Sequence, residues 1–298
     1  MAKITENIVD LTSYPKRYTG YAASPFRYPG GKGFLTPYLA NQMRQRFGNS
    51  SVAYAEPFCG GAGSALNLLV DKCVQQLHLN DADYRVFSAW KAMLKETDRF
   101  LEKLRTTYPD LATWEECLQK LYERPMSKYS FEVGFATFFI NRTSRSGVIM
   151  GSGPIGGYSQ EGKWKIGVRF NKDSLDKRIQ RIGRLSDKIS LSCMDGVDFC
   201  KNLEKDEALD KTFLFVDPPY VHAGGRLYYD GMNLAKHDAL ARWLLSGTAP
   251  HWLLTYDDHQ IVRENYSSMQ QHRIQVRYSL GKRRLEKELM YMTQFQTS

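Results

Sequence analysis

The alternation of apolar and polar segments divides the chain into two α/β stretches that flank a helix-rich block. In the first stretch, we predict two strands and two helices, at residues 51–55 and 76–79 and at residues 34–47 and 65–70. In the second stretch, we predict strands at 189–192, 212–216 and 251–255, a helix at 234–245, and a closing hairpin from 273–280 with 288–294. Strands that alternate with helices predict a parallel sheet with helices on its faces.

The block between these stretches has a different pattern. Apolar residues recur at helical spacing over residues 84–121, a strongly apolar segment covers 131–140 and leads into a polar loop, and a basic helical pattern covers 172–184. The first 23 residues lack clear periodicity. The predicted organisation is therefore an N-terminal arm, one α/β domain in two pieces, and a helix-rich insert, at residues 1–23, 24–84 with 186–298, and 85–185.

The net charge of +9 is concentrated in this insert. Between Arg85 and Arg184 lie 19 basic and 11 acidic residues, whereas the remainder of the chain holds 22 basic and 21 acidic residues. Such an excess favours a polyanionic partner whose contacts lie on the insert. The alternative is a merely soluble basic surface, and the charge alone does not separate the two.

Composition argues against several other classes of protein. No apolar run approaches the roughly 18 residues of a membrane span. Residues 1–10 hold Lys3, Glu6 and Asp10 and no apolar stretch typical of a secretory signal. The five cysteines form no CxxC pair, which predicts reduced thiols and a cytoplasmic location. The six histidines form no cluster with metal-ligand spacing, so we predict no metal site.

A glycine-rich turn follows the first predicted strand and opens the next helix. It contains Phe58, Gly60, Gly61 and Gly63, and a turn without Cβ atoms lets the backbone approach a ligand closely. Asp81 lies 18 residues after Gly63, where nucleotide-binding folds place an acid that accepts hydrogen bonds from ribose hydroxyls. The pattern favours a nucleotide-like ligand; an ordinary βα turn beside a surface acid is the alternative.

The strongest chemical signal is the segment Asp217-Pro218-Pro219-Tyr220, which follows the apolar run 212–216. Two successive prolines remove two N–H donors and fix an extended backbone at the end of the strand. The Asp217 carboxylate and the Pro218 carbonyl remain as acceptors beside the aromatic face of Tyr220. This set suits a planar group that bears an NH₂, because accepting its hydrogens localises the nitrogen lone pair for attack on a methyl group. A proline turn after a core strand is the alternative.

Through these motifs the sequence resembles the amino-methylating DNA methyltransferases, in particular the DNA adenine methylases of the Dam type. The resemblance covers about residues 24–298, in the family's motif order. The motifs are Arg27-Tyr-Pro-Gly-Gly-Lys32, Glu56-Pro-Phe-Cys-Gly-Gly-Ala-Gly63, Asn80-Asp-Ala-Asp83, Asp195 and Asp217-Pro-Pro-Tyr220. Asn141-Arg-Thr-Ser-Arg-Ser-Gly-Val148 with Gly153-Pro-Ile-Gly-Gly157 resembles part of the DNA-recognition insert in one branch of the family.

The resemblance implies an α/β fold with a Rossmann-like methyltransferase sheet and a basic, helix-rich target-recognition insert. It also implies S-adenosyl-L-methionine as methyl donor and no metal. The residues assigned to the donor are Tyr28, Lys32, Phe58, Gly60, Asp81, Asp195 and Asp217. Catalysis is assigned to Asp217, Pro218, Pro219 and Tyr220, and DNA contacts to Asn141, Arg142 and Arg145.

The implied function is direct transfer of a methyl group to N6 of adenine in double-stranded DNA, after the base is flipped out of the duplex. The alternatives are N4 of cytosine or an RNA substrate for the same fold, and a non-catalytic nucleic-acid-binding relative. Asp rather than Ser at position 217 favours adenine by resemblance, and the intact tetrapeptide and donor loop argue against a non-catalytic protein. A cognate restriction endonuclease is a possible partner of such an enzyme.

Overall fold

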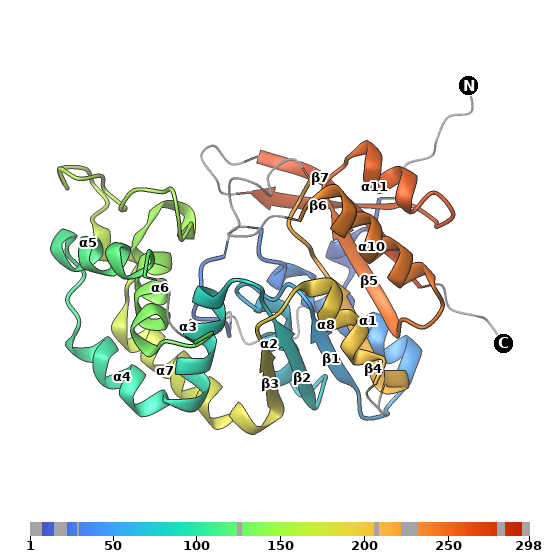
Figure 1. Ribbon diagram of the computed structural model, residues 1–298, viewed down its shortest axis with the longest axis horizontal. Coiled ribbons are helices and arrows are strands. Elements are labelled where there is room, and N and C mark those ends of the chain that lie inside the picture. The colour runs from blue at the N-terminus through green and yellow to red at the C-terminus, as the bar shows by residue number, and fades with distance from the viewer. Residues whose placement is uncertain are drawn as a thin grey trace.

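A mixed seven-stranded sheet forms the centre of the protein (Figure 1). The computed structural model describes residues 8–14, 23–28, 30–123, 127–205, 209–221, 232–278 and 284–293. The strand order is β3-β2-β1-β4-β5-β7-β6, in which β1 to β5 are parallel and β7 is antiparallel to both of its neighbours. The bounds are β1 Ala53–Glu56, β2 Gln76–Asn80, β3 Ile189–Ser192, β4 Thr212–Val216, β5 His251–Tyr256, β6 His272–Tyr278 and β7 Arg284–Met292. The predicted strands and the closing hairpin are confirmed.

Both faces of the sheet are buried, which explains why β4 is a continuous apolar run rather than an alternating one. Phe213 and Phe215 pack into one core cluster, whereas Leu214 and Val216 pack into the other. The first cluster includes residues of α1 Thr36–Phe47 and α2 Gly63–Val70. The second includes residues of α8 Gly196–Leu203, α10 Leu234–Leu245 and α11 Gln260–Asn265. The helices predicted at 34–47, 65–70 and 234–245 are therefore confirmed.

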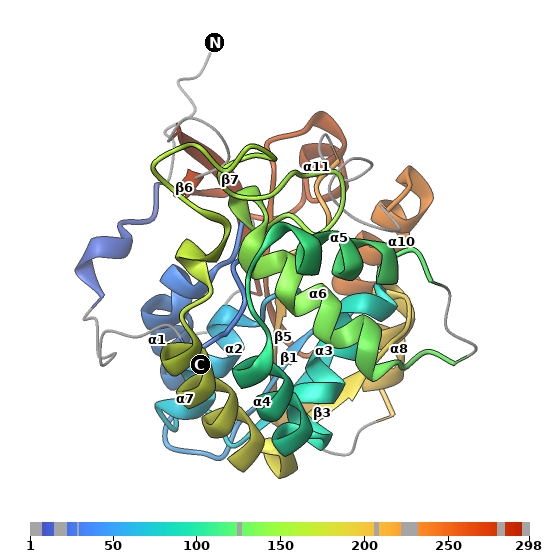
Figure 2. The ribbon, with the colours of Figure 1, turned by 90° about the vertical axis from the view of Figure 1, so that its left-hand side faces the viewer.

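The helices of the predicted insert gather at one end of the sheet, on the left of Figure 1, and Figure 2 shows them from their own side. They are α3 Tyr84–Lys95, α4 Thr97–Thr106, α5 Leu111–Lys120, α6 Phe131–Thr143 and α7 Lys172–Arg184. Helix α6 is buried along most of its length, and a Cβ on its Gly134 would lie 2.5 Å from the Ser88 carbonyl of α3. The buried side chains of these helices belong to the same cluster as one face of the sheet, so the core is continuous across the predicted boundaries.

Helix α6 also corrects one expectation. The polar segment after residue 140 was expected to be a loop, but the helix continues to Thr143. Asn141 and Arg142 therefore lie in its last turn, and only Arg145 of the three predicted DNA-contact residues lies in the following turn, Arg145–Gly147. The apolar pattern ends earlier than the helix because the last turn faces a polar environment, described below.

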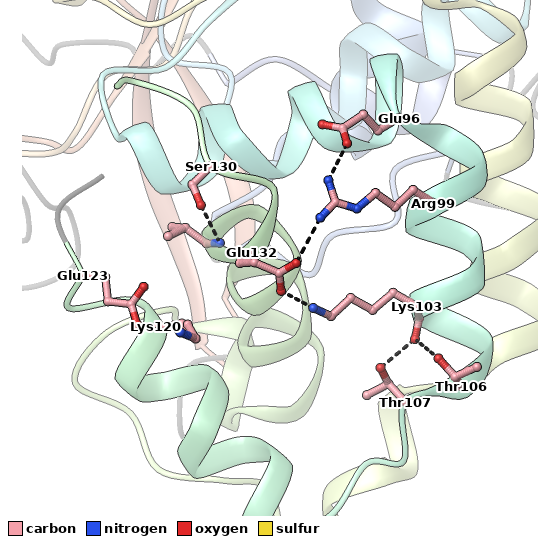
Figure 3. A network of polar contacts seen from close by, with 10 residues as sticks. Glu96, Arg99, Lys103, Thr106, Thr107, Lys120, Glu123, Ser130 and Glu132 are labelled. Atoms are coloured by element: carbon pink, nitrogen blue, oxygen red, sulfur yellow. Dashed lines mark hydrogen bonds and ion pairs between the residues drawn. The ribbon is translucent and has the colours of Figure 1, made fainter. Parts of the chain in front are cut away.

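A network of ion pairs joins α4 to α6 on the surface (Figure 3). The carboxylate of Glu132 on α6 pairs with Arg99 of α4 at 3.2 Å and also with Lys103. Arg99 in turn pairs with Glu96 at 2.7 Å, and its guanidinium lies 3.7 Å from the centre of the Phe131 ring. Exposed ion pairs contribute little to stability, so the buried aromatic side chains beneath them, such as Phe100, hold the two helices together.

Residues 8–14 of the predicted N-terminal arm pack against the sheet. Ile8 forms a bridge with Arg273 of β6, and the Val9 amide donates to the Arg273 carbonyl at 2.9 Å. Tyr14 meets Tyr38 edge-on with ring centres 5.1 Å apart. Within the residues that the structure describes, no helix has the length and apolarity needed to cross a membrane.

Candidate active site

A cavity of about 690 Å³ lies at the carboxyl ends of β1 and β4. The chain passes from β1 to β2 on one side, whereas β4 lies on the other side of β1; open α/β sheets bind ligands at such a point. Seven of the residues assigned to the donor or to catalysis line the cavity: Tyr28, Lys32, Phe58, Gly60, Asp81, Asp217 and Pro219. The predicted insert adds Arg85, Leu121, Tyr122, Gly147, Val148, Ile149 and Met150. The structure therefore brings together most of the predicted donor residues with part of the tetrapeptide.

Both backbone groups of Gly60 anchor the glycine loop by hydrogen bonds. Its amide donates to Asp81 Oδ2 at 2.9 Å, and its carbonyl accepts from the indole N–H of Trp90 at 2.8 Å. Gly60 has a φ of +44°, and a Cβ there would lie 2.7 Å from the Tyr28 ring. Glycine is therefore needed both for the backbone conformation and for the close approach of Tyr28, which covers the loop.

The three polar residues of the motif after β2 have different positions. The buried Asn80 side chain donates to the carbonyls of Pro57 and Met194, each at 2.9 Å, and so ties together the loops that follow β1 and β3. Asp83 caps α3 and pairs with Arg85 at 2.7 Å. Asp81 lines the cavity, and burial together with the nearby charge of Asp83 raises the pKa of its carboxyl to about 7. Both aspartates line the cavity, but Asp81 holds the glycine loop through the Gly60 amide, whereas Asp83 is engaged with Arg85.

A buried cluster of charges surrounds the tetrapeptide. Lys32 Nζ lies 2.8 Å from Asp217 Oδ2, 3.4 Å from Glu288 Oε2 of β7, and 2.7 Å from the Tyr220 hydroxyl. The Tyr220 hydroxyl donates to Glu288 Oε1 at 2.7 Å. Burial would lower the pKa of the Lys32 ammonium, but the carboxylates of Asp217 and Glu288 outweigh burial and raise that pKa above its ordinary value. Lys32 is therefore held as a cation beside the tetrapeptide.

The end of β5 fixes the tetrapeptide from the other side. The Thr255 hydroxyl donates to Asp217 Oδ1 at 2.7 Å, and the Val221 amide donates to Asp257 Oδ1 at 3.2 Å. Pro218 is buried, whereas the Asp217 side chain keeps 21% of its surface exposed. The carboxylate is thus oriented by Lys32 and Thr255 while one edge of it stays accessible.

Two carboxylates of the site were missed from the sequence as separate functional residues. Glu288 lies in the predicted hairpin. A carboxylate at a buried position of an apolar strand could have indicated a functional residue, but the strand pattern alone identifies no partner for it. Glu56 ends β1 and lines the cavity, where it accepts hydrogen bonds from Tyr54 at 3.0 Å and Ser64 at 2.8 Å. Burial, reinforced by the charge of Asp217, raises the pKa of the Glu56 carboxyl to about 7.

Comparison with known protein families identifies the family of this chain. A family model for the D12 class N6 adenine-specific DNA methyltransferases matches residues 28–280. The chain belongs to this family. It is therefore an adenine-specific DNA methyltransferase, and DNA is its substrate.

Comparison with curated proteins gives no match. Among solved structures, an rRNA methyltransferase, AviRa from Streptomyces viridochromogenes, is similar with a TM-score of 0.40 and 16% identity, covering 89% of this chain and 86% of its own. A SAM-dependent methyltransferase from Agrobacterium tumefaciens has a TM-score of 0.39 and 12% identity over 86% of this chain and 60% of its own. A putative class I S-adenosylmethionine-dependent methyltransferase from Listeria monocytogenes has a TM-score of 0.36 and 10% identity over 89% and 60%.

One residue assigned to the donor in this methyltransferase does not line the cavity. Asp195 caps α8 by accepting from the Val197 amide at 2.8 Å, and it pairs with Lys236 at 2.9 Å. Burial opposes its ionisation, but Lys236 and the helix amides outweigh burial and lower the pKa of Asp195. A contact between Asp195 and the donor stays a prediction.

The predicted DNA contacts separate into two groups. The Asn141 side chain is buried; it accepts from the Arg27 amide at 2.8 Å and donates to the carbonyls of Arg27 at 3.1 Å and Gly147 at 2.7 Å. This geometry corrects the expected DNA contact, because the amide is engaged within the protein. Arg142 likewise donates to the carbonyls of Arg169 at 2.8 Å and Pro25 at 3.2 Å. Arg145 is exposed on the turn beside the second glycine segment, where its amide donates to Gly153 at 3.0 Å.

Proposed function

We propose that this enzyme transfers the methyl group of S-adenosyl-L-methionine directly to N6 of an adenine that has been flipped out of double-stranded DNA. The observation that carries the proposal is the position of Asp217, which is fixed by Lys32 and Thr255 with one edge accessible at a cavity of donor size. The reaction class is a methyl transfer to an exocyclic amine with no covalent enzyme intermediate and no metal.

The residues present fit a donor that carries a ribose, a charged amino-acid end and an adenine. Asp81 offers a carboxylate at the end of β2, suited to accept hydrogen bonds from the ribose hydroxyls. Gly60 permits close approach of the backbone, while Tyr28 and Phe58 supply aromatic surface. Bound S-adenosyl-L-methionine supplies an electrophilic methyl group. Lys32 also lines the cavity, and its ammonium suits the carboxylate end of such a donor.

The target amine is proposed to bind to the tetrapeptide. Asp217 and the Pro218 carbonyl accept hydrogen bonds from the amine, and the Tyr220 ring stacks on the base. Lys32 holds the Asp217 carboxylate and Glu288 holds the Tyr220 hydroxyl, so the acceptor and the ring are positioned before the base arrives. Such preorganised electrostatic contacts and positioning supply most of the catalysis expected of a reaction without a covalent enzyme intermediate.

The DNA side of the proposal rests on the exposed Arg145 and on the basic insert. A base inside a duplex cannot reach the tetrapeptide, so it must be extruded at a cost of a few kcal/mol of unstacking. A duplex with a fluorescent adenine analogue at the target position tests this step, because an unstacked analogue brightens on binding. In the cell, we propose that the enzyme acts in the cytoplasm, where a cognate restriction endonuclease is its candidate partner.

Nucleoside analysis tests the proposed reaction. The protein is incubated with donor labelled with tritium in its methyl group and with unmethylated duplex DNA, and the product is digested to nucleosides. Label is expected in N6-methyladenine. Label in N4-methylcytosine, or label that enters RNA and not DNA, would contradict the proposal. Fully N6-methylated duplex of the same sequence is the control and should accept no label.

A further inference from the structure

Four arginines from distant parts of the chain lie close together where residues 24–27 contact the predicted insert. This arginine cluster consists of Arg27, Arg142 in the last turn of α6, Arg169 in the turn Ile166–Arg169, and Arg178 of α7. The positive charges of Arg27, Arg178 and Arg169 lower the pKa of Arg142, and the charge of Arg169 lowers the pKa of Arg27. Neither the charge excess nor the motifs of the sequence pointed to this grouping.

The cluster is held by neutral groups. Arg142 donates to the carbonyls of Arg169 and Pro25, and Arg178 Nη1 donates to the Ser24 carbonyl at 2.9 Å. Arg27 Nη1 donates to the Ser144 carbonyl at 3.3 Å. Across the part of the chain that the structure describes, no carboxylate forms an ion pair with any of these four guanidinium groups. The positive charge of the cluster is therefore uncompensated within the described protein.

Uncompensated charge of one sign opposes the folded state. Burial and the charges of its three neighbours lower the pKa of Arg142 to about 9, and burial also lowers the pKa of Arg27 and Arg178. A guanidinium carries five N–H donors, and those of Arg178 that do not reach the Ser24 carbonyl remain to bind another acceptor. Arg169 is exposed, so the cluster is open to solvent on that side. These features suit an anion that arrives from outside.

We propose that the arginine cluster binds a backbone phosphate of the DNA substrate, close to the target nucleotide. The proposal rests on the proposed function. Among the four arginines, only Arg142 was assigned to DNA contacts from the sequence, so the proposal adds Arg27, Arg169 and Arg178 as DNA-binding residues. Guanidinium groups match the geometry of phosphate oxygens, and a phosphodiester is the anion that a DNA substrate presents at regular spacing. Arg27 and Gly147 both line the cavity, and a Cβ on Gly147 would lie 1.8 Å from the Arg27 carbonyl, so the cluster adjoins the cavity mouth.

The cluster also adjoins the segment that covers the donor loop. Arg178 and Arg142 hold the carbonyls of Ser24 and Pro25, and the chain then reaches Tyr28, whose ring covers Gly60. A phosphate bound by these arginines neutralises their repulsion and so stabilises this segment. The site thus connects DNA binding with the segment over the cavity.

The test compares Arg169→Ala with Arg184→Ala in full-length protein. Arg169 is exposed and its side chain makes none of the hydrogen bonds given above, so its removal spares the fold. Arg184 is an exposed arginine at the end of α7, beside Thr97 and Arg105, and its substitution removes the same charge away from the cluster. The probes are unmethylated duplexes of several sequences, with binding measured by fluorescence anisotropy over a range of salt concentrations. Arg178→Gln, which removes a second cluster charge, serves as an independent variant.

Arg169→Ala and Arg178→Gln are expected to weaken binding to every duplex by roughly 10-fold at low salt. Each should also lower the slope of log affinity against log salt by about one unit relative to Arg184→Ala. Donor affinity of Arg169→Ala without DNA should stay unchanged. Affinities and slopes equal to those of Arg184→Ala would overturn the proposal, and so would a loss confined to duplexes that share one base pair, since that marks base reading. Wild-type protein that binds no duplex would instead overturn the proposed function itself.

Discussion

Lys32 and Asp217 form an ion pair of 2.8 Å although 185 positions separate them in the chain. Lys32 closes the glycine segment before α1, and Asp217 opens the tetrapeptide after β4. The ion pair therefore joins the glycine segment 30–33, which lines the cavity, to the residue proposed to accept a hydrogen bond from the target amine. Glu288 of β7 is the second carboxylate of Lys32, at 3.4 Å, and it also receives the hydrogen bond of Tyr220.

Glu288→Gln should lower the rate of methyl transfer while leaving DNA affinity almost unchanged. The variant removes one of two negative charges that raise the pKa of Lys32, so that pKa falls. Lys32 then loses its proton at a lower pH, and activity should decline earlier as the pH rises into the alkaline range. We expect roughly a 10-fold loss in kcat at neutral pH, the effect of one charged hydrogen bond.

The matched control for this variant is Glu286→Gln, which removes an exposed carboxylate from the same strand. Its kcat and pH profile should match those of the wild type. An unshifted alkaline limb in Glu288→Gln, with kcat equal to that of the control, would remove Glu288 from the positioning of the tetrapeptide.

Donor affinity should depend on pH through Asp81. Its carboxyl has a pKa raised to about 7, and the ionised form accepts hydrogen bonds from ribose hydroxyls better than the protonated form. Affinity should therefore fall as the pH decreases through about 7. Asp81→Asn should bind the donor about 10- to 100-fold more weakly, and its affinity should lose this pH dependence. Calorimetry measures the donor affinity at each pH. If the affinity of Asp81→Asn keeps the pH dependence of the wild type, the group that titrates is not Asp81, and Glu56, whose pKa is also raised to about 7, becomes the candidate.

Two glycines with the same backbone conformation separate steric from conformational effects. Gly147 and Gly151 both have a φ of +76°, but a Cβ on Gly147 would lie 1.8 Å from the Arg27 carbonyl, whereas a Cβ on Gly151 meets nothing within 4 Å. Gly151→Ala should cost roughly 1 kcal/mol of stability, the penalty of the left-handed conformation. Gly147→Ala should cost clearly more and should also weaken donor binding, because it displaces the segment that leads to Tyr28. Equal unfolding midpoints in denaturant for the two variants would argue against this contact.

A substitution in the last turn of α6 should lower stability, whereas a substitution in the turn that follows should lower DNA affinity. Asn141→Ala leaves backbone groups of Arg27 and the buried Gly147 carbonyl without these partners and should lower stability by about 1–3 kcal/mol. Arg145→Ala removes an exposed side chain and should leave stability unchanged while it lowers DNA affinity. Thermal unfolding and DNA titration of both variants check this division. A stable Asn141→Ala protein with a loss of DNA affinity alone would restore Asn141 as a DNA contact.

The elements that depend on local pattern were predictable from the sequence. The run Thr212–Val216 is a buried strand because its five residues are apolar apart from the first, and the two prolines that follow end it. Gly60 and Asp81 were predicted as donor-binding residues because a glycine turn follows one strand and an acid ends the next. In the structure the Gly60 amide donates to Asp81 at 2.9 Å, so the two lie side by side, while their contact with the donor stays a prediction.

The contacts that depend on tertiary packing were not predictable. Glu288 reaches Tyr220 only because β7 inserts between β5 and β6, and no spacing in the sequence encodes that order. The sequence around Arg142 is polar and predicts a surface loop. In the structure α6 continues through Arg142, whose side chain donates hydrogen bonds to the carbonyls of Pro25 and Arg169. A polar residue after an apolar helix gives the same pattern whether it meets solvent or the carbonyls of another segment.

The most direct test of the account is the single-turnover rate of Asp217→Ala with saturating donor and unmethylated duplex DNA. The central claim is that the Asp217 carboxylate accepts a hydrogen bond from the target amine, so its removal should slow methyl transfer by at least about 100-fold. Thr255, Glu288 and the rest of the sheet remain, so circular dichroism and DNA affinity should match the wild type. A rate equal to that of the wild type in this folded, DNA-binding variant would contradict the mechanism.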